Sequence, residues 1–178
     1  MLFGGVNAVY CPGCRPRGGF SRRGTEQWAP SDDDFRESFT FTALVSLTSA
    51  QPCWVSPPRT GTNDQFDFLR VIVWLVTERA LVAGDYLILD NARVHAADTK
   101  AYVQALLDYH GVKLRFLPAY SPELNPCELV FAEVKRRLRT EPRLFQSFWR
   151  ETLRHFACIT HRMVNSYYKH CLLAPLGR

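Results

Sequence analysis

The sequence lacks an apolar run long enough to cross a membrane. Its longest candidate, VIVWLV at residues 71–76, is far shorter than the roughly 20 residues that a membrane helix needs. Residues 1–10 also lack a basic leader and the cleavage site of a signal peptide. We therefore expect no membrane partner.

A dense framework of cysteines is missing as well. The six cysteines are scattered along the chain, without the density of a disulfide-stabilised secreted scaffold. Cys11 and Cys14 form CPGC, half of a zinc-site spacing, and His155, Cys158 and His161 offer the other half. Because no second clean pair is present, we do not predict structural zinc. We expect free thiols and an intracellular protein, nuclear if the source is a eukaryote.

Residues 1–25 contain no Asp or Glu, and the first acidic residue of the chain is Glu26. The whole chain has 22 Lys and Arg against 17 Asp and Glu, a formal charge of +5 and a pI near 9.0. This modest excess favours an anionic partner such as nucleic acid. With 47% hydrophobic residues among 178, the chain can bury a globular core.

Apolar periodicity predicts a mixed α/β fold. Two strand–helix units with short crossovers imply that strands 86–90 and 113–117 pair in parallel and end at one edge of a sheet. The predicted order begins with a hairpin of strands 38–48 and 52–58, the second at an edge, followed by a helix of about five turns from Phe66 to Gly84. A strand (86–90), a helix ending at Gly111 and a second strand (113–117) come next. The chain then forms a helix opened by Asn125 and Pro126 and one long helix from Pro142 to about residue 170.

Two carboxylates are predicted to meet at that edge of the sheet. Asp90 ends a strand, and Glu128 lies in the first turn of the helix that follows PAYSPELNP. Converging carboxylates can hold divalent metal ions for phosphoryl transfer. Each residue also has a simpler interpretation, because Asn125 and Glu128 have capping-box spacing and Asp90 with Asn91 fits a turn.

Basic and polar side chains accompany these two acids. His95 fits capping or packing as well as catalysis. The helix after Asn125 carries basic residues on its outer face, which either contact phosphates or form a solvated face. The candidate nucleic-acid contacts are Arg22, Arg23, Arg93, Lys135, Arg136 and Arg139.

Together, LILDNARVH (87–95), LPAYSPELNPCE (117–128) and VKRRLR (134–139) resemble the catalytic domain of DDE transposases of the mariner-like group, also called DDE superfamily endonucleases. The resemblance implies a ribonuclease-H-like mixed sheet flanked by helices. It also implies three acids that bind two Mg²⁺ or Mn²⁺ ions for DNA cleavage and joining. The second acid falls on Asp90 and the third on Glu128, as catalytic residues and metal ligands. The supporting residues are Asn91, His95 and Asn125.

The first acid of that family pattern is missing. In the family it ends the first strand, ahead of a basic segment that RPRGGFSRRGT resembles through Phe20 and Gly24. It should fall near residues 4–7, which contain no acid. Either glycine has replaced it or the chain begins inside a longer protein, and the usual helix-turn-helix region is missing too. The acidic cluster at residues 32–34 fits capping and solvation better than metal binding. We expect the first central strand to be short or missing.

Three hypotheses follow from the resemblance and its gap. The first is a transposase-derived DDE domain, ancestrally cleaving and transferring DNA strands, which binds Mg²⁺ or Mn²⁺ weakly and is catalytically impaired. The second is a non-catalytic nucleic-acid-binding or interaction protein domesticated from a transposase, and the third is an unstable fragment. The expected partner is DNA, with no small-molecule substrate, and a homodimer is compatible. The expected domains are a basic irregular segment with a remnant first strand (1–37), a DDE catalytic-type core (38–142) and a C-terminal helix packing on it (143–178).

Overall fold

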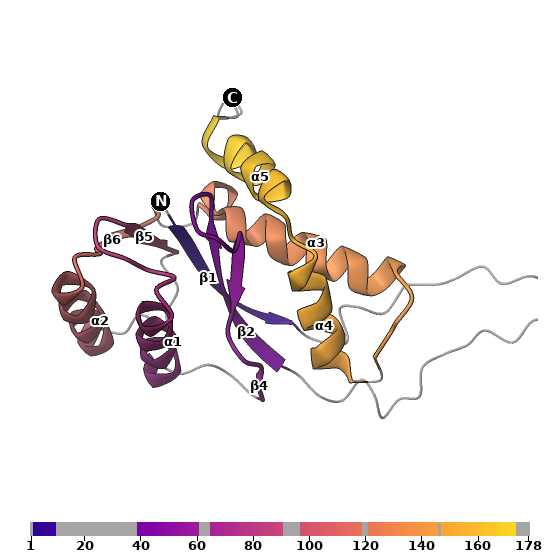
Figure 1. The fold of residues 1–178 in the computed structure, drawn as a ribbon, viewed down its shortest axis with the longest axis horizontal. Helices are drawn as coiled ribbons and strands as arrows, with labels where there is room; N and C mark the ends of the chain where they lie inside the picture. The colour runs from indigo at the N-terminus through magenta and orange to yellow at the C-terminus, as the bar shows by residue number, and fades with distance from the viewer. Residues whose placement is uncertain are drawn as a thin grey trace, which may run out of the picture.

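The computed structural model describes residues 2–9, 39–60, 65–90, 97–118, 121–145 and 147–173. They form a mixed sheet with helices on both faces (Figure 1). The strands are β1 Leu2–Val9, β2 Phe39–Ser46, β3 Cys53–Val55, β4 Arg59–Thr60, β5 Tyr86–Leu89 and β6 Lys113–Phe116. The helices are α1 Gln65–Thr77, α2 Ala97–Tyr109, the 3-10 helix η3 Pro122–Leu124, α3 Pro126–Thr140, α4 Phe148–Ala157 and α5 His161–Leu173. No helix within these ranges is long and apolar enough to span a membrane.

The strands follow the order β3-β2-β1-β5-β6, and β4 also pairs with β2. β2 pairs antiparallel with β1 and with β3, so the predicted hairpin is present and β3 lies at an edge. β1, β5 and β6 are parallel. The predicted parallel pairing is confirmed, and the carboxyl ends of β5 and β6 share one edge.

β1 corrects the expectation of a short or missing first strand. It has eight residues, Leu2–Val9, and lies between β2 and β5. Gly4 and Gly5 lower its intrinsic preference for a strand. Pairing outweighs that preference, because every residue of β1 has a partner in β2 and the residues from Leu2 to Gly4 also have partners in β5.

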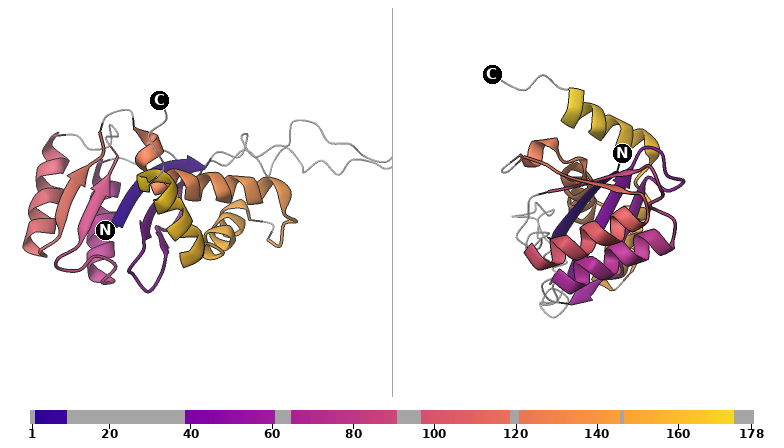
Figure 2. Two further views of the ribbon diagram at one scale, coloured as in Figure 1. Left: turned by 90° about the horizontal axis from the view of Figure 1, so that it is seen from above. Right: turned by 90° about the vertical axis from the view of Figure 1, so that its left-hand side faces the viewer.

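Alternation along β5 divides the core into two layers. Leu87 and Leu89 pack with α1 and α2, whereas Ile88 packs with α3, α4 and α5 on the other face. Figures 1 and 2 show the two groups of helices on opposite sides of the sheet. β2 is buried along its whole length. Side chains on the Ile88 face of the sheet are therefore directed toward the layer that contains α3.

α1 is shorter than predicted and ends well before Gly84. The chain turns at Arg79, whose φ is 56°. The N–H of Ala80 donates to the carbonyl of Leu75 at 2.9 Å, and that of Arg79 donates to Val76 at 3.1 Å. This is the Schellman pattern, in which glycine usually takes the left-handed position. Since arginine takes it here, no glycine marks the end of the helix in the sequence.

The predicted long C-terminal helix is in fact two helices, α4 and α5, separated by residues 158–160. The N–H of Ile159 donates to the carbonyl of Phe156 at 3.0 Å, which tightens the end of α4. The hydroxyl of Thr160 then accepts from the N–H of Met163 at 3.3 Å and caps α5. Apolar periodicity continues across this break, so periodicity alone predicted a single helix.

Candidate active site at the carboxyl edge of the parallel strands

Asp90 directly follows β5 and is half-buried. The ladder with β6 continues to this level, because the N–H of Leu117 donates to the carbonyl of Leu89 at 2.8 Å. Alternation places Asp90 on the same face as Ile88, which is the face that α3 covers. Asp90 thus lies at the carboxyl edge of the parallel strands, where sites in α/β sheets commonly form.

Glu128 lies in the first turn of α3, as predicted. Asn125 caps this helix through Oδ1, which accepts from the N–H of Cys127 at 3.1 Å, and Pro126 takes the first helical position. In a capping box, Glu128 would bond back to the N–H of Asn125. That N–H already donates to the carbonyl of Pro122 at 3.0 Å. Capping therefore does not require the Glu128 carboxylate.

The two carboxylates lie within electrostatic reach of each other. Burial raises the pKa of Glu128, the Asp90 carboxylate raises it further, and Lys135 lowers it. The Cys127 thiol is buried beside them, and its pKa is raised well above the usual range by burial and then by Cys53, Glu128 and Asp90. Two carboxylates that are close together and partly buried repel each other, and a divalent cation bound between them relieves that repulsion.

Position 5 of β1 is a glycine, and the strand register shows where it lies relative to Asp90. Gly4 pairs with Leu89 across the parallel ladder, which makes Gly5 level with Asp90. Across the antiparallel ladder Gly5 pairs with Ala43, which belongs to the core layer of α3. Position 5 therefore lies on the same face as Asp90. The family resemblance predicts the first acid near residues 4–7, and of these positions Gly5 is the one that the register sets level with Asp90.

Asp90 and Glu128 offer the hard oxygen ligands that Mg²⁺ and Mn²⁺ prefer. Two such ions about 4 Å apart are a common arrangement for phosphoryl transfer. In the part of the chain that the structure describes, no group of three or more His, Cys, Asp and Glu side chains could hold a metal ion.

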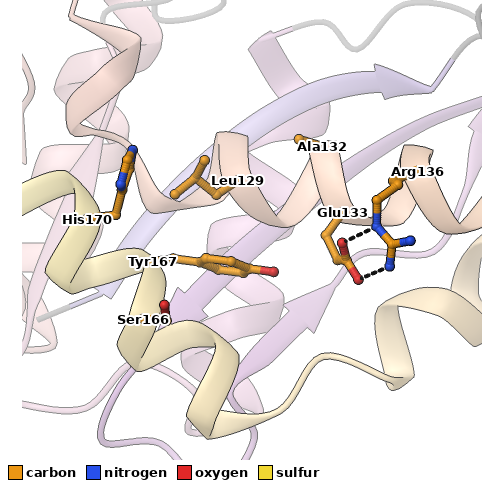
Figure 3. A pocket seen from close by; sticks show the side chains of 7 residues that line it. All are labelled: Leu129, Ala132, Glu133, Arg136, Ser166, Tyr167 and His170. Atoms are coloured by element: carbon orange, nitrogen blue, oxygen red, sulfur yellow. Dashed lines mark hydrogen bonds and ion pairs between the residues drawn. The ribbon is translucent and has the colours of Figure 1, made fainter.

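Two of the predicted basic residues share the stripe of α3 that carries Glu128. Lys135 and Arg139 follow Glu128 by 7 and 11 positions, which are helical repeats. Arg136 lies on the adjoining stripe, where its guanidinium makes two hydrogen bonds of 2.8 Å with Glu133 (Figure 3). This pair was missed from the sequence, although its spacing of three is the signal for it. Pairing leaves Arg136 less available to phosphates.

A pocket of about 400 Å³ lies between α3 and α5 (Figure 3). Burial raises the pKa of Tyr167 in this pocket, and Glu133 raises it further. Neither Asp90 nor Glu128 lines it, so it is distinct from the acid pair. The lining residues are Leu129, Ala132, Glu133, Arg136, Ser166, Tyr167 and His170.

Several predicted site residues lie outside the described residues, and their roles stay predictions. This also applies to the CPGC cysteines of the zinc alternative and to the acids at residues 32–34. The predicted site residues in question are Arg22, Arg23, Asn91, Arg93 and His95.

Comparison with solved structures finds the same fold in Mos1 mariner transposase. The Mos1 mariner paired-end complex with Mn is 17% identical, with a TM-score of 0.64 over 96% of this chain and 53% of that chain. The Mos1 strand transfer complex is 15% identical, with a TM-score of 0.66 over 96% and 51%. The Mos1 transposase catalytic domain with raltegravir and Mn is 14% identical, with a TM-score of 0.60 over 96% and 78%. The chain spans about half the length of the transposase in the two complexes. The predicted ribonuclease-H-like fold is confirmed.

No curated protein matches the chain in sequence. A sequence profile of the family described as DDE superfamily endonuclease matches residues 11–150. This match covers most of the chain and includes both Asp90 and Glu128. The chain therefore belongs to the DDE superfamily endonuclease family.

Proposed function

We propose that the chain is a transposase-derived DDE domain whose ancestral reaction is metal-dependent cleavage and strand transfer of DNA, and whose own catalysis is impaired. The observation that carries the proposal is the register of β1, which puts Gly5 level with Asp90 on the face of α3. Family membership supports the ancestral reaction. The similar Mos1 structures include complexes with Mn and with Mg and a strand transfer complex.

Asp90 and Glu128 are the proposed ligands of Mg²⁺ or Mn²⁺. A bound cation would supply Lewis-acid stabilisation of the charge that develops on a phosphate. Glu128 is partly buried, so its charge is less screened by water than a surface carboxylate would be. Two carboxylates in place of three provide less charge and less geometric definition, and we therefore expect weak binding. Asn91, His95 and Asn125 support the site in this proposal.

DNA is the proposed partner. Lys135 and Arg139 lie on the stripe of α3 that carries Glu128, which would bring phosphates alongside the acid pair. The Mos1 structures include paired-end complexes, and a homodimer of this chain is part of the proposal. The proposal also includes a nuclear location if the source is a eukaryote, and it includes no small-molecule substrate.

A second function, non-catalytic binding of nucleic acid or another partner, is favoured by the same glycine. β1 pairs with β2 along its whole length and with β5 from Leu2 to Gly4, so the fold does not need an acid at position 5. A protein domesticated from a transposase could therefore keep its sheet and its basic stripe while losing the reaction. This alternative differs from the first in having no use for a divalent cation.

Restoring an acid at position 5 tests the proposal. The unmodified chain, Gly5→Asp and Gly5→Asn would be compared by Mn²⁺ titration and by nicking of supercoiled plasmid with Mg²⁺ or Mn²⁺. Asparagine has the shape of aspartate without its charge, which makes it the matched control. We expect the unmodified chain neither to cut nor to join DNA, and Gly5→Asp to bind Mn²⁺ more tightly than Gly5→Asn.

Two results would contradict separate parts of the proposal. Mg²⁺-dependent cleavage by the unmodified chain, lost in Glu128→Gln, would show that a third ligand lies elsewhere and that catalysis is intact. Equal Mn²⁺ affinity in Gly5→Asp and Gly5→Asn would show that position 5 is not a ligand position. Circular dichroism of each variant confirms that the comparison is made between folded proteins.

A further inference from the structure

Asn125 uses only one end of its side-chain amide within the described part of the chain. The residue is 1% exposed. Its Oδ1 accepts from the N–H of Cys127 at 3.1 Å. Its Nδ2 is buried and has no hydrogen-bond partner among the described residues. A buried donor without an acceptor is costly, so this atom calls for a functional explanation.

The cap of α3 fixes the direction of this amide. Turning the amide over would place its NH₂ against the N–H of Cys127, so that two donors would face each other and the helix would lose its cap. Capping does not require the free donor, because serine, threonine and aspartate cap helices as well. Among these side chains, only asparagine carries a donor on an atom separate from the capping oxygen.

Asn125 and Glu128 both belong to the start of α3, as its cap residue and as a residue of its first turn. Glu128 lies three residues after Asn125, a spacing at which its side chain can reach back toward the cap residue. Glu128 is half-buried and within electrostatic reach of Asp90. A carboxylate that binds a metal through one oxygen has a second oxygen to place, and such carboxylates are commonly held by a further hydrogen bond.

We propose that Asn125 is a positioning residue whose Nδ2 donates a hydrogen bond to the Glu128 carboxylate when Glu128 binds a divalent cation together with Asp90. This inference rests on the proposed function, because it takes Glu128 as a metal ligand. The hydrogen bond fixes the direction of the carboxylate, so less side-chain freedom is lost when the cation binds. One asparagine thereby caps α3 with its oxygen and orients a ligand with its nitrogen.

Serine and alanine at position 125 separate this role from capping. Both lack Nδ2, but serine keeps a capping oxygen and alanine does not. Mn²⁺ affinity of the full chain would be measured by paramagnetic broadening in ¹H–¹⁵N spectra, and Tm would be measured without added metal. We expect Asn125→Ser and Asn125→Ala each to lose Mn²⁺ affinity by about tenfold or more, whereas only Asn125→Ala lowers Tm. In the unmodified chain, Mg²⁺ should shift the Asn125 side-chain NH₂ signal downfield.

Glu128→Gln distinguishes failure of this inference from failure of the proposed function. Unchanged Mn²⁺ affinity in Glu128→Gln would overturn Glu128 as a ligand. Loss of affinity in Glu128→Gln together with full affinity in Asn125→Ser would overturn the role of Asn125 alone and leave it a helix cap. The NH₂ signal of Asn125 is followed in the unmodified chain, so a signal unmoved by Mg²⁺ counts against the inference even if a variant does not fold.

Discussion

Glu128 meets two opposing demands at the scale of a single residue. Its half-buried place strengthens the attraction of its carboxylate for a cation. Burial, and then the Asp90 carboxylate, also favour its protonated form. The charge that a metal site needs is therefore a charge that the protein alone holds at a cost in stability.

Glu128→Gln should stabilise the protein at neutral pH. Folding raises the pKa of Glu128, so its contribution to stability is fully present below the unfolded value near 4.5 and is lost as pH rises through the folded value. Glutamine resembles the protonated form at every pH. We expect a gain in the free energy of unfolding at pH 7, which disappears as pH falls below the unfolded pKa. Urea unfolding at several pH values measures it.

Glu123→Gln is the matched control for removing one negative charge. Glu123 is exposed and lies in η3, shortly before α3. Its substitution should change the free energy of unfolding little, as surface substitutions usually do. A Glu128→Gln variant that is less stable than the unmodified chain at pH 7 would show that the charged carboxylate holds the fold together instead of straining it.

At the element scale, the sequence predicted those helix ends that carry standard end residues. Asn125 and Pro126 begin α3, and Gly111, with φ of 70°, follows the end of α2. The end that it missed after α1 lacks such a signal, because arginine takes the left-handed position there. Before α5 a signal is present, since Thr160 caps the helix, but the continuous apolar pattern outweighed it. Local patterns record preferences, whereas these two ends are set by packing of the whole chain.

Arg79→Gly tests this account of the end of α1. Arg79 is exposed and has φ of 56°, a conformation that glycine adopts without the strain that a side chain adds. We expect Arg79→Gly to raise the free energy of unfolding by roughly 0.5–1 kcal/mol. Glu78→Gly is the control, because its N–H continues the helix to Trp74 and glycine there should cost about 1 kcal/mol. Destabilisation by both substitutions would show that the Arg79 side chain outweighs its strain.

At the scale of the whole molecule, fold and site are separable. Topology predicted that Asp90 and Glu128 meet, since parallel strands end at one edge and α3 starts there. The alignment of Gly5 with Asp90 could not be predicted from the sequence. It depends on how β1 pairs with β5, and strand register is a property of the assembled sheet. The same pairing explains how the sheet keeps its central strand without the first acid.

The arrangement of charge over the molecule predicts how it binds DNA. Lys135 and Arg139 share the Glu128 stripe of α3, and Arg136 lies on the adjoining stripe. We expect affinity for an arbitrary DNA duplex to fall steeply with salt, as phosphate contacts require. Lys135→Ala and Arg139→Ala should each weaken binding and reduce the slope of log affinity against log salt by about 0.9. Fluorescence anisotropy over a range of salt concentrations measures both quantities.

Arg136→Ala is the matched control for that prediction, since it removes one positive charge from the same helix. We expect it to leave the salt slope nearly unchanged, because the guanidinium is already bound to a carboxylate and gains less from a phosphate. Equal effects of all three substitutions would mean that DNA responds to net charge and not to the stripe beside the acid pair. Binding that is absent or insensitive to salt would show that these residues form a solvated face, and the alternative of a protein partner would then be favoured over DNA.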